Sequence, residues 1–213
     1  MRFADDALKL LDHLDLKINL NIKGDRSNRF ISTAALHSLT LDHARAICNL
    51  IKIGVPASAF ALLRVAFESY IRGAWIHHCA SDKQVETFYK NKGIKENPNA
   101  KEIDFEKLVQ QVEQATGSPA YLSAIKTKSW KALNSYTHSG MHQISRYIVH
   151  NTITPNFSED EKYEVVELSL ILSCFSLAGI LDLCKVENSE LIADEILVAV
   201  IAWKKSYKPK LPA

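Results

Sequence analysis

The sequence predicts an all-α protein, a single-domain helical bundle of about seven to nine helices over residues 1–213. Apolar residues recur at steps of three and four along most of the chain, as they do on the buried face of a helix. Only 7 glycines and 6 prolines are present, too few for the many turns of a β-sandwich or barrel. We find no convincing strand pattern and no internal repeat.

Charge and cysteine content exclude several classes of protein. A net charge of +2 is too small for non-specific attraction to nucleic acid, although it leaves room for a local basic pocket. The absence of a C-x-x-C pair predicts reduced core thiols, rather than a zinc finger or a disulfide framework, at Cys48, Cys79, Cys174 and Cys184.

No feature of the sequence predicts a targeting or membrane segment. The chain begins with charged residues and lacks an apolar signal core. Its longest apolar run, residues 168–181, is shorter than the about 20 residues that a membrane span needs. We therefore expect a cytoplasmic protein without membrane contact.

The first half of the chain divides into helices at clear stop signals. Three long helices are predicted over residues 3–20, 30–53 and 57–80, and Gly54 followed by Pro56 separates the second from the third. A short helix then reaches residue 92. The polar stretch 91–101 is predicted to be a loop, and we favour a surface excursion over a mobile lid.

The second half is predicted to be helical as well. Its helices are expected over residues 104–115, 119–126 and 129–150, the last with an interruption at Gly140. Ser158 and Glu161 form a capping-box pattern before the long apolar helix that ends near Cys184. A last helix opens at Ser189. The strong apolar character of these two helices predicts either the centre of the bundle or a dimer interface.

Two rows of polar residues stand out in this apolar pattern. In the 57–80 helix, Arg64, Glu68 and Arg72 are spaced by four and share one face. Buried charge is costly unless it is paired. The row is therefore either a structural salt-bridge ladder or part of a functional site.

The second row lies in the predicted 129–150 helix. Asn134, His138, His142 and Arg146 are again spaced by four, with Tyr136 close by. Such a row is either an ordinary solvated face or a binding surface. If the two rows face each other, arginines that bind phosphate and a histidine that exchanges protons near neutral pH would suffice for metal-independent RNA cleavage. The same groups would suit a phosphorylated small molecule.

Two further patterns carry less weight. Arg72 and His77 form an R-x4-H string, but in a straight helix the two side chains point about 140° apart. His138 and His142 have the spacing of zinc ligands on a helix, yet Ser139 stands where an H-E-x-x-H motif has glutamate. A metal enzyme is therefore the third hypothesis, and we expect neither a metal nor a cofactor.

The segments LRVAFESYIRGAW (residues 63–75) and NSYTHSG (residues 134–140) resemble those of a family of bacterial helical proteins of unknown function. That family in turn resembles the HEPN superfamily, whose bundles include toxin and phage-defence ribonucleases. The resemblance implies a homodimer with an R-x4–6-H motif at its cleft, which would make Arg72 and His77 catalytic. This chain departs from the pattern, because Gly73 replaces a usually polar residue and the helix comes early. His138 is therefore an alternative to His77.

The leading hypothesis is a HEPN-like endoribonuclease, a toxin or defence effector that acts as a homodimer and has an antitoxin as partner. It assigns catalysis to Arg64, Glu68, Arg72, His77 and His138, and ligand binding to Asn134, Tyr136, His142 and Arg146. The alternative is a non-catalytic bundle that binds a nucleotide-like ligand or a partner protein through the same residues.

Overall fold

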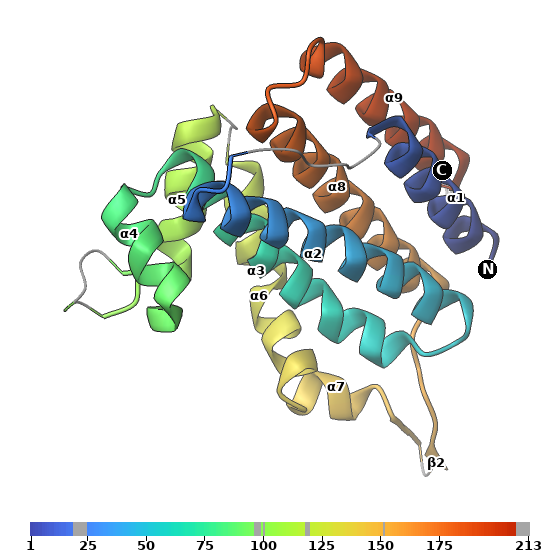
Figure 1. The fold of residues 1–213 in the computed structure, drawn as a ribbon. Coiled ribbons are helices and arrows are strands. Elements are labelled where there is room, and N and C mark those ends of the chain that lie inside the picture. Colours follow the sequence, from blue (N-terminus) through green and yellow to red (C-terminus); the bar gives the residue numbers. More distant parts are fainter. Residues whose placement is uncertain (19–24, 96–98, 100, 118–119, 151, 208–213) are drawn as a thin grey trace.

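The computed structural model describes residues 1–18, 25–95, 99, 101–117, 120–150 and 152–207. Over these residues the chain is the predicted all-α bundle (Figure 1). Its α-helices are α1 (Arg2–Ile18), α2 (Asn28–Lys52), α3 (Pro56–His78), α4 (Asp82–Thr87), α5 (Phe105–Thr116), α6 (Tyr121–Thr137), α7 (Met141–Ser145), α8 (Glu159–Leu183) and α9 (Ser189–Tyr207).

Three long helices, α2, α3 and α8, form the centre of the bundle (Figure 1). Pro56 begins α3, where its missing N–H costs no hydrogen bond. Most of the α3 surface is covered by its neighbours, and the largest side chains in this core, Phe67, Ile71 and Trp75, are at most 1% exposed. The polar residues of α3 are therefore set into a helix that is otherwise enclosed.

Helices α1 and α9 lie side by side and bring the two ends of the described chain together (Figure 1). The indole Nε1 of Trp203 donates to the carbonyl oxygen of Phe3 at 3.0 Å. Trp203 also stacks on Tyr163 of α8, with ring centroids 5.2 Å apart. The first and last helices are thus fixed to each other and to the central helix α8.

Helix α8 begins where the sequence predicts. The Ser158 Oγ accepts from the Glu161 N–H at 3.2 Å, and the Glu161 carboxylate accepts from the Ser158 N–H at 2.9 Å, so the capping box is confirmed. Among the described residues, α8 is the one helix whose length and apolar composition would allow it to cross a membrane. In the fold, 61% of its most apolar stretch is buried against other helices.

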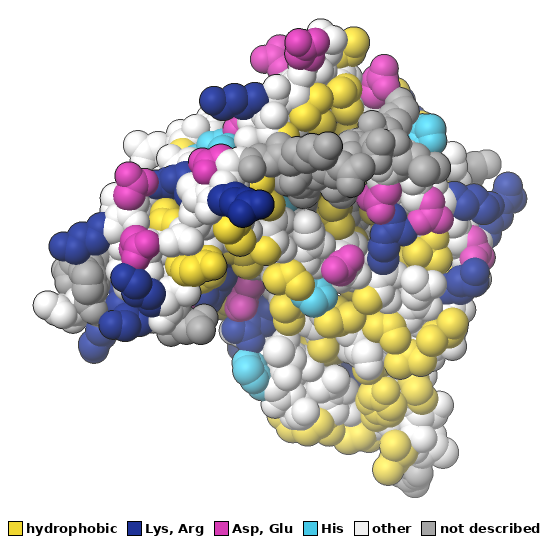
Figure 2. All heavy atoms as spheres, in the orientation of Figure 1, with side chains coloured by type: hydrophobic (Ala, Val, Ile, Leu, Met, Phe, Trp, Pro, Cys, Tyr) yellow, Lys and Arg dark blue, Asp and Glu magenta, His cyan; other side chains and the backbone are white. Residues whose placement is uncertain are grey.

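Of the two apolar helices at the end of the chain, α8 is the one at the centre of the bundle. Helix α8 lies in the core, whereas α9 covers it and turns Leu191, Leu197 and Val198 outward, each between 49% and 64% exposed. Hydrophobic side chains also gather over the end of the bundle from which the β-hairpin described below projects (Figure 2).

The predicted boundaries between residues 119 and 150 are partly wrong. A single helix, α6, runs from Tyr121 to Thr137 without the break expected at residues 127–128. The interruption expected at Gly140 is confirmed, because α7 begins at Met141. After α7 comes an antiparallel hairpin that the sequence did not predict, formed by β1 (Ile148–Val149) and β2 (Thr152–Ile153). Each strand has only two residues, too short for an alternating pattern to be recognised.

The polar loop after α4 is partly described. Helix α4 continues into a π-helical turn, η1 (Phe88–Lys92). The buried residues Ile94 and Ile103 then close the loop, and the Ile103 N–H donates to the Ile94 carbonyl at 2.6 Å. Residues 96–98 and 100, in the middle of the predicted excursion, lie outside the described residues. All four cysteines are free, as predicted.

Candidate functional site

The first polar row begins with an ion pair along α3. Arg64 Nε donates to Glu68 Oε1 at 3.0 Å, and Arg64 Nη2 lies 2.8 Å from the same oxygen. The two side chains are 18% and 24% exposed, so the pair is partly removed from solvent. Because Glu68 engages two of the three guanidinium nitrogens, it fixes the plane in which the third nitrogen points.

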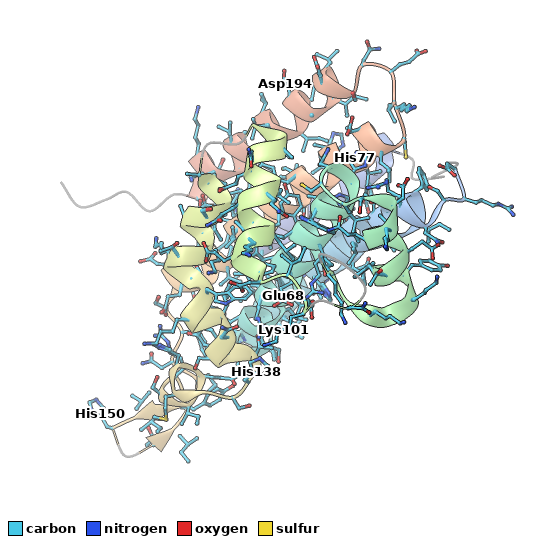
Figure 3. All side chains as sticks on the ribbon, turned by 90° about the vertical axis from the view of Figure 1, so that its left-hand side faces the viewer. Glu68, His77, Lys101, His138, His150 and Asp194 are labelled. Atoms are coloured by element: carbon cyan, nitrogen blue, oxygen red, sulfur yellow. The ribbon has the colours of Figure 1, made fainter. Side chains whose placement is uncertain are left out.

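That third nitrogen meets the second polar row. Arg64 Nη1 lies 2.6 Å from Nε2 of His138, the C-cap residue of α6. A guanidinium has only hydrogen-bond donors, so His138 Nε2 must be the acceptor. In this arrangement His138 Nε2 presents a lone pair to Arg64. Figure 3 shows Glu68 and His138 close together where α3 meets α6.

Aromatic side chains pack against Arg64. Its guanidinium carbon lies 5.0 Å from the centroid of the Trp130 ring, within the range of a cation–π contact. Trp130 stacks on Phe105, with centroids 4.5 Å apart, and meets the edge of Phe67. We call Arg64, Glu68, Trp130 and His138 the Arg64 cluster. Its guanidinium is held by a carboxylate, an imidazole and a ring, so its orientation is set before any ligand arrives.

A tight turn after α6 places His138 at the cluster. Ser139 has a φ of 53°, and the Gly140 N–H donates to the Ser135 carbonyl at 2.7 Å. A Cβ on Gly140 would lie 2.5 Å from Ser135 Oγ and 3.1 Å from Ser135 Cα. Only glycine allows the chain to return so closely to α6, and this return leaves His138 exposed at the helix end beside Arg64.

Arg72 does not join the Arg64 cluster. It lies two turns, or about 12 Å, farther along the axis of α3. There its Nη1 lies 3.2 Å from a carboxylate oxygen of Glu102, in the segment before α5. The side chains of this second ion pair are 30% and 49% exposed, so it is wetter than the pair of Arg64 and Glu68.

His77 is separated from Arg72, as the helix geometry predicted. Its Nε2 lies 2.7 Å from Asp182 Oδ2, near the end of α8. Arg72 and His77, the two residues of the R-x4-H string, therefore do not pair with each other, since they have partners on different sides of α3. Figure 3 shows His77 and His138 far apart along the bundle.

The second polar row is broken by the turn at Ser139, so its four residues do not share one helical face. Asn134 remains on α6, where its Oδ1 is buried without a hydrogen-bond partner among the described residues. His142 lies exposed on the short helix α7. The expectation of a continuous row is wrong because α6 ends before the row does.

Arg146, the last residue of that row, ties the end of α7 to the start of α8. Its Nε donates to the Tyr136 hydroxyl at 3.3 Å, and its Nη2 forms an ion pair with Glu161. Its guanidinium also lies 5.9 Å from the ring centroid of Phe157. Tyr136, Arg146 and Glu161 line a cavity of about 240 Å³ between α3, α6 and α8.

The sequence interpretation missed another set of residues, at the far end of α3. His37 of α2 is only 1% exposed, and its Nε2 has no partner among the described residues. Burial lowers the pKa of His37 to about 3, with a smaller contribution from His77 and His78. His37 was missed because a single histidine within an apolar helix forms no recurring pattern with other polar residues. Trp130 and Glu102 were likewise missed, because their roles depend on contacts between distant segments.

Comparison with known proteins gives one match. The model of a family described as "Family of unknown function (DUF6988)" matches residues 37–199, more than half of the chain. No curated protein and no solved structure matches significantly. The matched segment contains α3 and α6, and therefore every member of the Arg64 cluster.

Proposed function

We propose that this chain, which belongs to the DUF6988 family of unknown function, is a metal-independent endoribonuclease whose active site is the Arg64 cluster. The observation that carries the proposal is the contact of 2.6 Å between Arg64 Nη1 and His138 Nε2. It sets a phosphate-binding group beside a proton acceptor, the two functions that cleavage of RNA by its own 2′-hydroxyl requires.

In the proposed reaction Arg64 and His138 have one role each. Arg64 binds a non-bridging oxygen of the scissile phosphate and stabilises the charge that builds on the pentavalent phosphorane. His138 Nε2 takes the proton of the 2′-hydroxyl as O2′ forms its bond to phosphorus. The bond from phosphorus to O5′ then breaks, and O5′ takes a proton from solvent, which reaches the exposed end of α6. The products are a 2′,3′-cyclic phosphate and a 5′-hydroxyl.

In this proposal the resting enzyme is held inactive by its own arginine. The lone pair of His138 Nε2 that must accept the proton is already occupied by the Arg64 N–H. A phosphate oxygen that binds Nη1 competes with the imidazole for the same hydrogen. Substrate binding therefore frees the base at the moment at which the phosphate is in place, while Glu68 keeps the guanidinium in its plane.

The test is cleavage of a labelled single-stranded RNA of mixed sequence in excess EDTA, with DNA of the same sequence as the negative substrate. We expect fragments that end in a cyclic phosphate. His138→Gln should lower kcat by about 10²–10⁴-fold, as the loss of a general base does. Arg64→Lys should also lower kcat, since lysine cannot hold Glu68, a phosphate and the Trp130 ring together. Arg72→Ala should act mainly through KM, because Arg72 lies too far from His138.

Matched controls are His13→Gln and Arg2→Lys, both on the exposed side of α1. They should cleave like the wild type after the same purification, which also controls for contaminating nuclease. Undiminished cleavage by His138→Gln, or cleavage that EDTA abolishes, would contradict the proposal.

The proposal extends to the biology that the HEPN-like resemblance implies: a cytoplasmic toxin or defence effector that acts as a homodimer and is restrained by an antitoxin. Induced expression of the wild type should then arrest growth, whereas His138→Gln should not. Light scattering behind size exclusion should give twice the mass of the 23.9 kDa chain. A monomer would remove the homodimer and leave the cleavage assay unaffected.

A second candidate function is supported by the cavity beside Arg146. A non-catalytic bundle could bind a nucleotide-like ligand there, with Arg146 and Lys128 in its lining beside the carboxylates of Glu161 and Glu164. A phosphate would compete with Glu161 for Arg146. This function predicts that adenosine or uridine monophosphate raises Tm without turnover, and that Arg146→Gln removes the effect. Ligand stabilisation together with inactive protein in the RNA assay would favour this candidate over the nuclease.

A further inference from the structure

The ends of α3 and α8 bring together three side chains that ligate metals. His77 and His78 are the last two residues of α3, and Asp182 is the residue before the last of α8. One ligand atom from each of the three lies within 4.8 Å of the other two. Among them, His77 Nε2 lies 2.7 Å from Asp182 Oδ2.

We propose that His77, His78 and Asp182 form a binding site for one divalent transition-metal ion, with zinc preferred. Imidazole nitrogen and carboxylate oxygen are both zinc ligands, and three protein ligands with one open position make a four-coordinate site. Ligand atoms around a tetrahedral zinc lie about 3.3 Å apart. The ion would therefore part His77 from Asp182 slightly and draw the third ligand inward.

The local electrostatic field favours a cation at this position. Helix α8 presents its C-terminal end here, and the carbonyl groups of its last turn carry partial negative charge. At the end of α3 the Arg29 guanidinium already donates to the carbonyls of Ile76 and Ala80. The favourable field therefore comes from α8 and Asp182. The Asp182 carboxylate adds a full negative charge, and its side chain is 65% exposed, so an ion can reach it from solvent. Both histidines are accessible to an ion without a change in the fold, because His77 is half-buried and His78 is exposed.

The fourth position would face an existing cavity. His78 and Asp182 line a cavity of about 320 Å³, whose other walls include Tyr70 and Phe175. This volume exceeds the about 30 Å³ that one water molecule takes up in the liquid, so a metal-bound water fits without rearrangement of the core. An open site of this kind can bind a small ligand on the ion, unlike a structural site that four side chains close.

Thiolates are not part of the assigned ligand set, although two cysteines stand close in sequence. Cys79 follows His78 directly, but its Sγ points to the Gln111 carbonyl of α5, at 3.5 Å. Cys184 is the C-cap residue of α8, two positions after Asp182. Their absence from the set distinguishes this site from a zinc–thiolate site and gives the experiment a spectroscopic signature.

The proposed metal site is separate from the proposed nuclease site at the Arg64 cluster. His77 is thirteen positions from Arg64, which places it about 20 Å away along the axis of α3. Removal of the ion should therefore leave RNA cleavage in EDTA unchanged.

The test uses the full chain, stripped with EDTA and dialysed, and titrated with Zn²⁺ alone by calorimetry. We expect one equivalent to bind and Tm to rise. His78→Gln and Asp182→Asn change exposed side chains, so both variants should fold, and each should weaken binding at least tenfold. Co²⁺ should give the visible bands of a tetrahedral site without a thiolate charge-transfer band.

Matched controls are His13→Gln and Cys184→Ser, which should bind Zn²⁺ like the wild type. Circular dichroism checks that every variant is folded. Three results would overturn the site: a wild type that binds no Zn²⁺, undiminished binding in both site variants, or a thiolate band that disappears in Cys184→Ser.

Discussion

Arg64 and Arg72 show how two identical side chains on one helix face acquire different surroundings. Arg64 is held by Glu68, His138 and the Trp130 ring. Arg72 has an exposed carboxylate, Glu102, as its partner. A guanidinium with three fixed contacts is oriented in advance for an incoming oxyanion, whereas one in a solvated ion pair contributes charge with little direction.

His37 makes a residue-scale prediction about pH. Burial lowers its pKa to about 3, against 6.5 in an unfolded chain. Between these two values the unfolded chain binds a proton that the folded chain rejects, so the free energy of unfolding falls as pH falls below 6.5. This loss of stability is negligible at pH 7.5, under about 0.1 kcal/mol, and amounts to about 2 kcal/mol at pH 5. Urea unfolding at pH 7.5 and pH 5 measures it.

The matched variant is His37→Phe, which keeps a ring in the same space and cannot titrate. Its free energy of unfolding should fall about 2 kcal/mol less than that of the wild type over the same interval. His13→Gln, at an exposed position, should follow the wild type. If wild type and His37→Phe lose stability in parallel, His37 is not buried as a neutral group.

At the scale of elements, the packing of α2 against α3 and α8 depends on two glycines that face His37. A Cβ on Gly179 of α8 would lie 2.7 Å from His37 Nε2, and one on Gly73 of α3 would lie 3.3 Å from His37 Cε1. Neither position has a positive φ, so neither glycine is required by its backbone conformation. The imidazole fills the space that their missing side chains leave between three helices.

Gly179→Ala should therefore destabilise the protein by about 1–3 kcal/mol through overpacking, although alanine in a helix is ordinarily the better residue. In a His37→Ala background the same substitution should become neutral or stabilising, because the methyl group then enters vacated space. Chemical denaturation of the four members of this double-mutant cycle measures the coupling. Additive effects of the two substitutions would show that the glycine and the imidazole do not compete for space.

At the scale of the whole molecule, the first and last helices, α1 and α9, pack against each other. Helix α1 is held on α8 and α9 by ring contacts of Phe3 and by the hydrogen bond from Trp203 Nε1 to the Phe3 carbonyl. That hydrogen bond joins residues 200 positions apart in the chain. They lie at the opposite side of the bundle from the turn that carries His138 (Figure 1).

Trp203→Phe tests this packing. The substitution keeps a ring to stack on Tyr163 and removes the indole N–H, so it should cost about 1 kcal/mol of global stability. Amide exchange should accelerate in α1 while α3 stays protected. Tyr89→Phe, at an exposed position in η1, is the control and should change neither quantity. Equal acceleration in α1 and α3 would show that the ends unfold together with the core.

Local chemistry in the sequence determined the helices and most of their boundaries. The spacing of apolar residues, the Ser158 and Glu161 capping box, and the Gly54 and Pro56 stop signals each act within a few residues. For the same reason the sequence identified Arg64, Glu68 and His138 as candidate residues. It also anticipated the interruption at Gly140, but it failed on either side of it: residues 127–128 continue α6, and residues 148–149 form a strand.

Tertiary structure alone decided which candidates meet. Arg64 and His138 are 74 positions apart, and Arg72 turns to Glu102 and His77 to Asp182 through contacts that no spacing encodes. Helical periodicity fixes the direction of a side chain around its own axis, but the packing of one helix on another fixes what that side chain faces. The sequence by itself therefore determined the bundle and the residues with chemistry to offer. The packing of α3 against α6 and α8 placed Arg64 beside His138 and His77 beside Asp182.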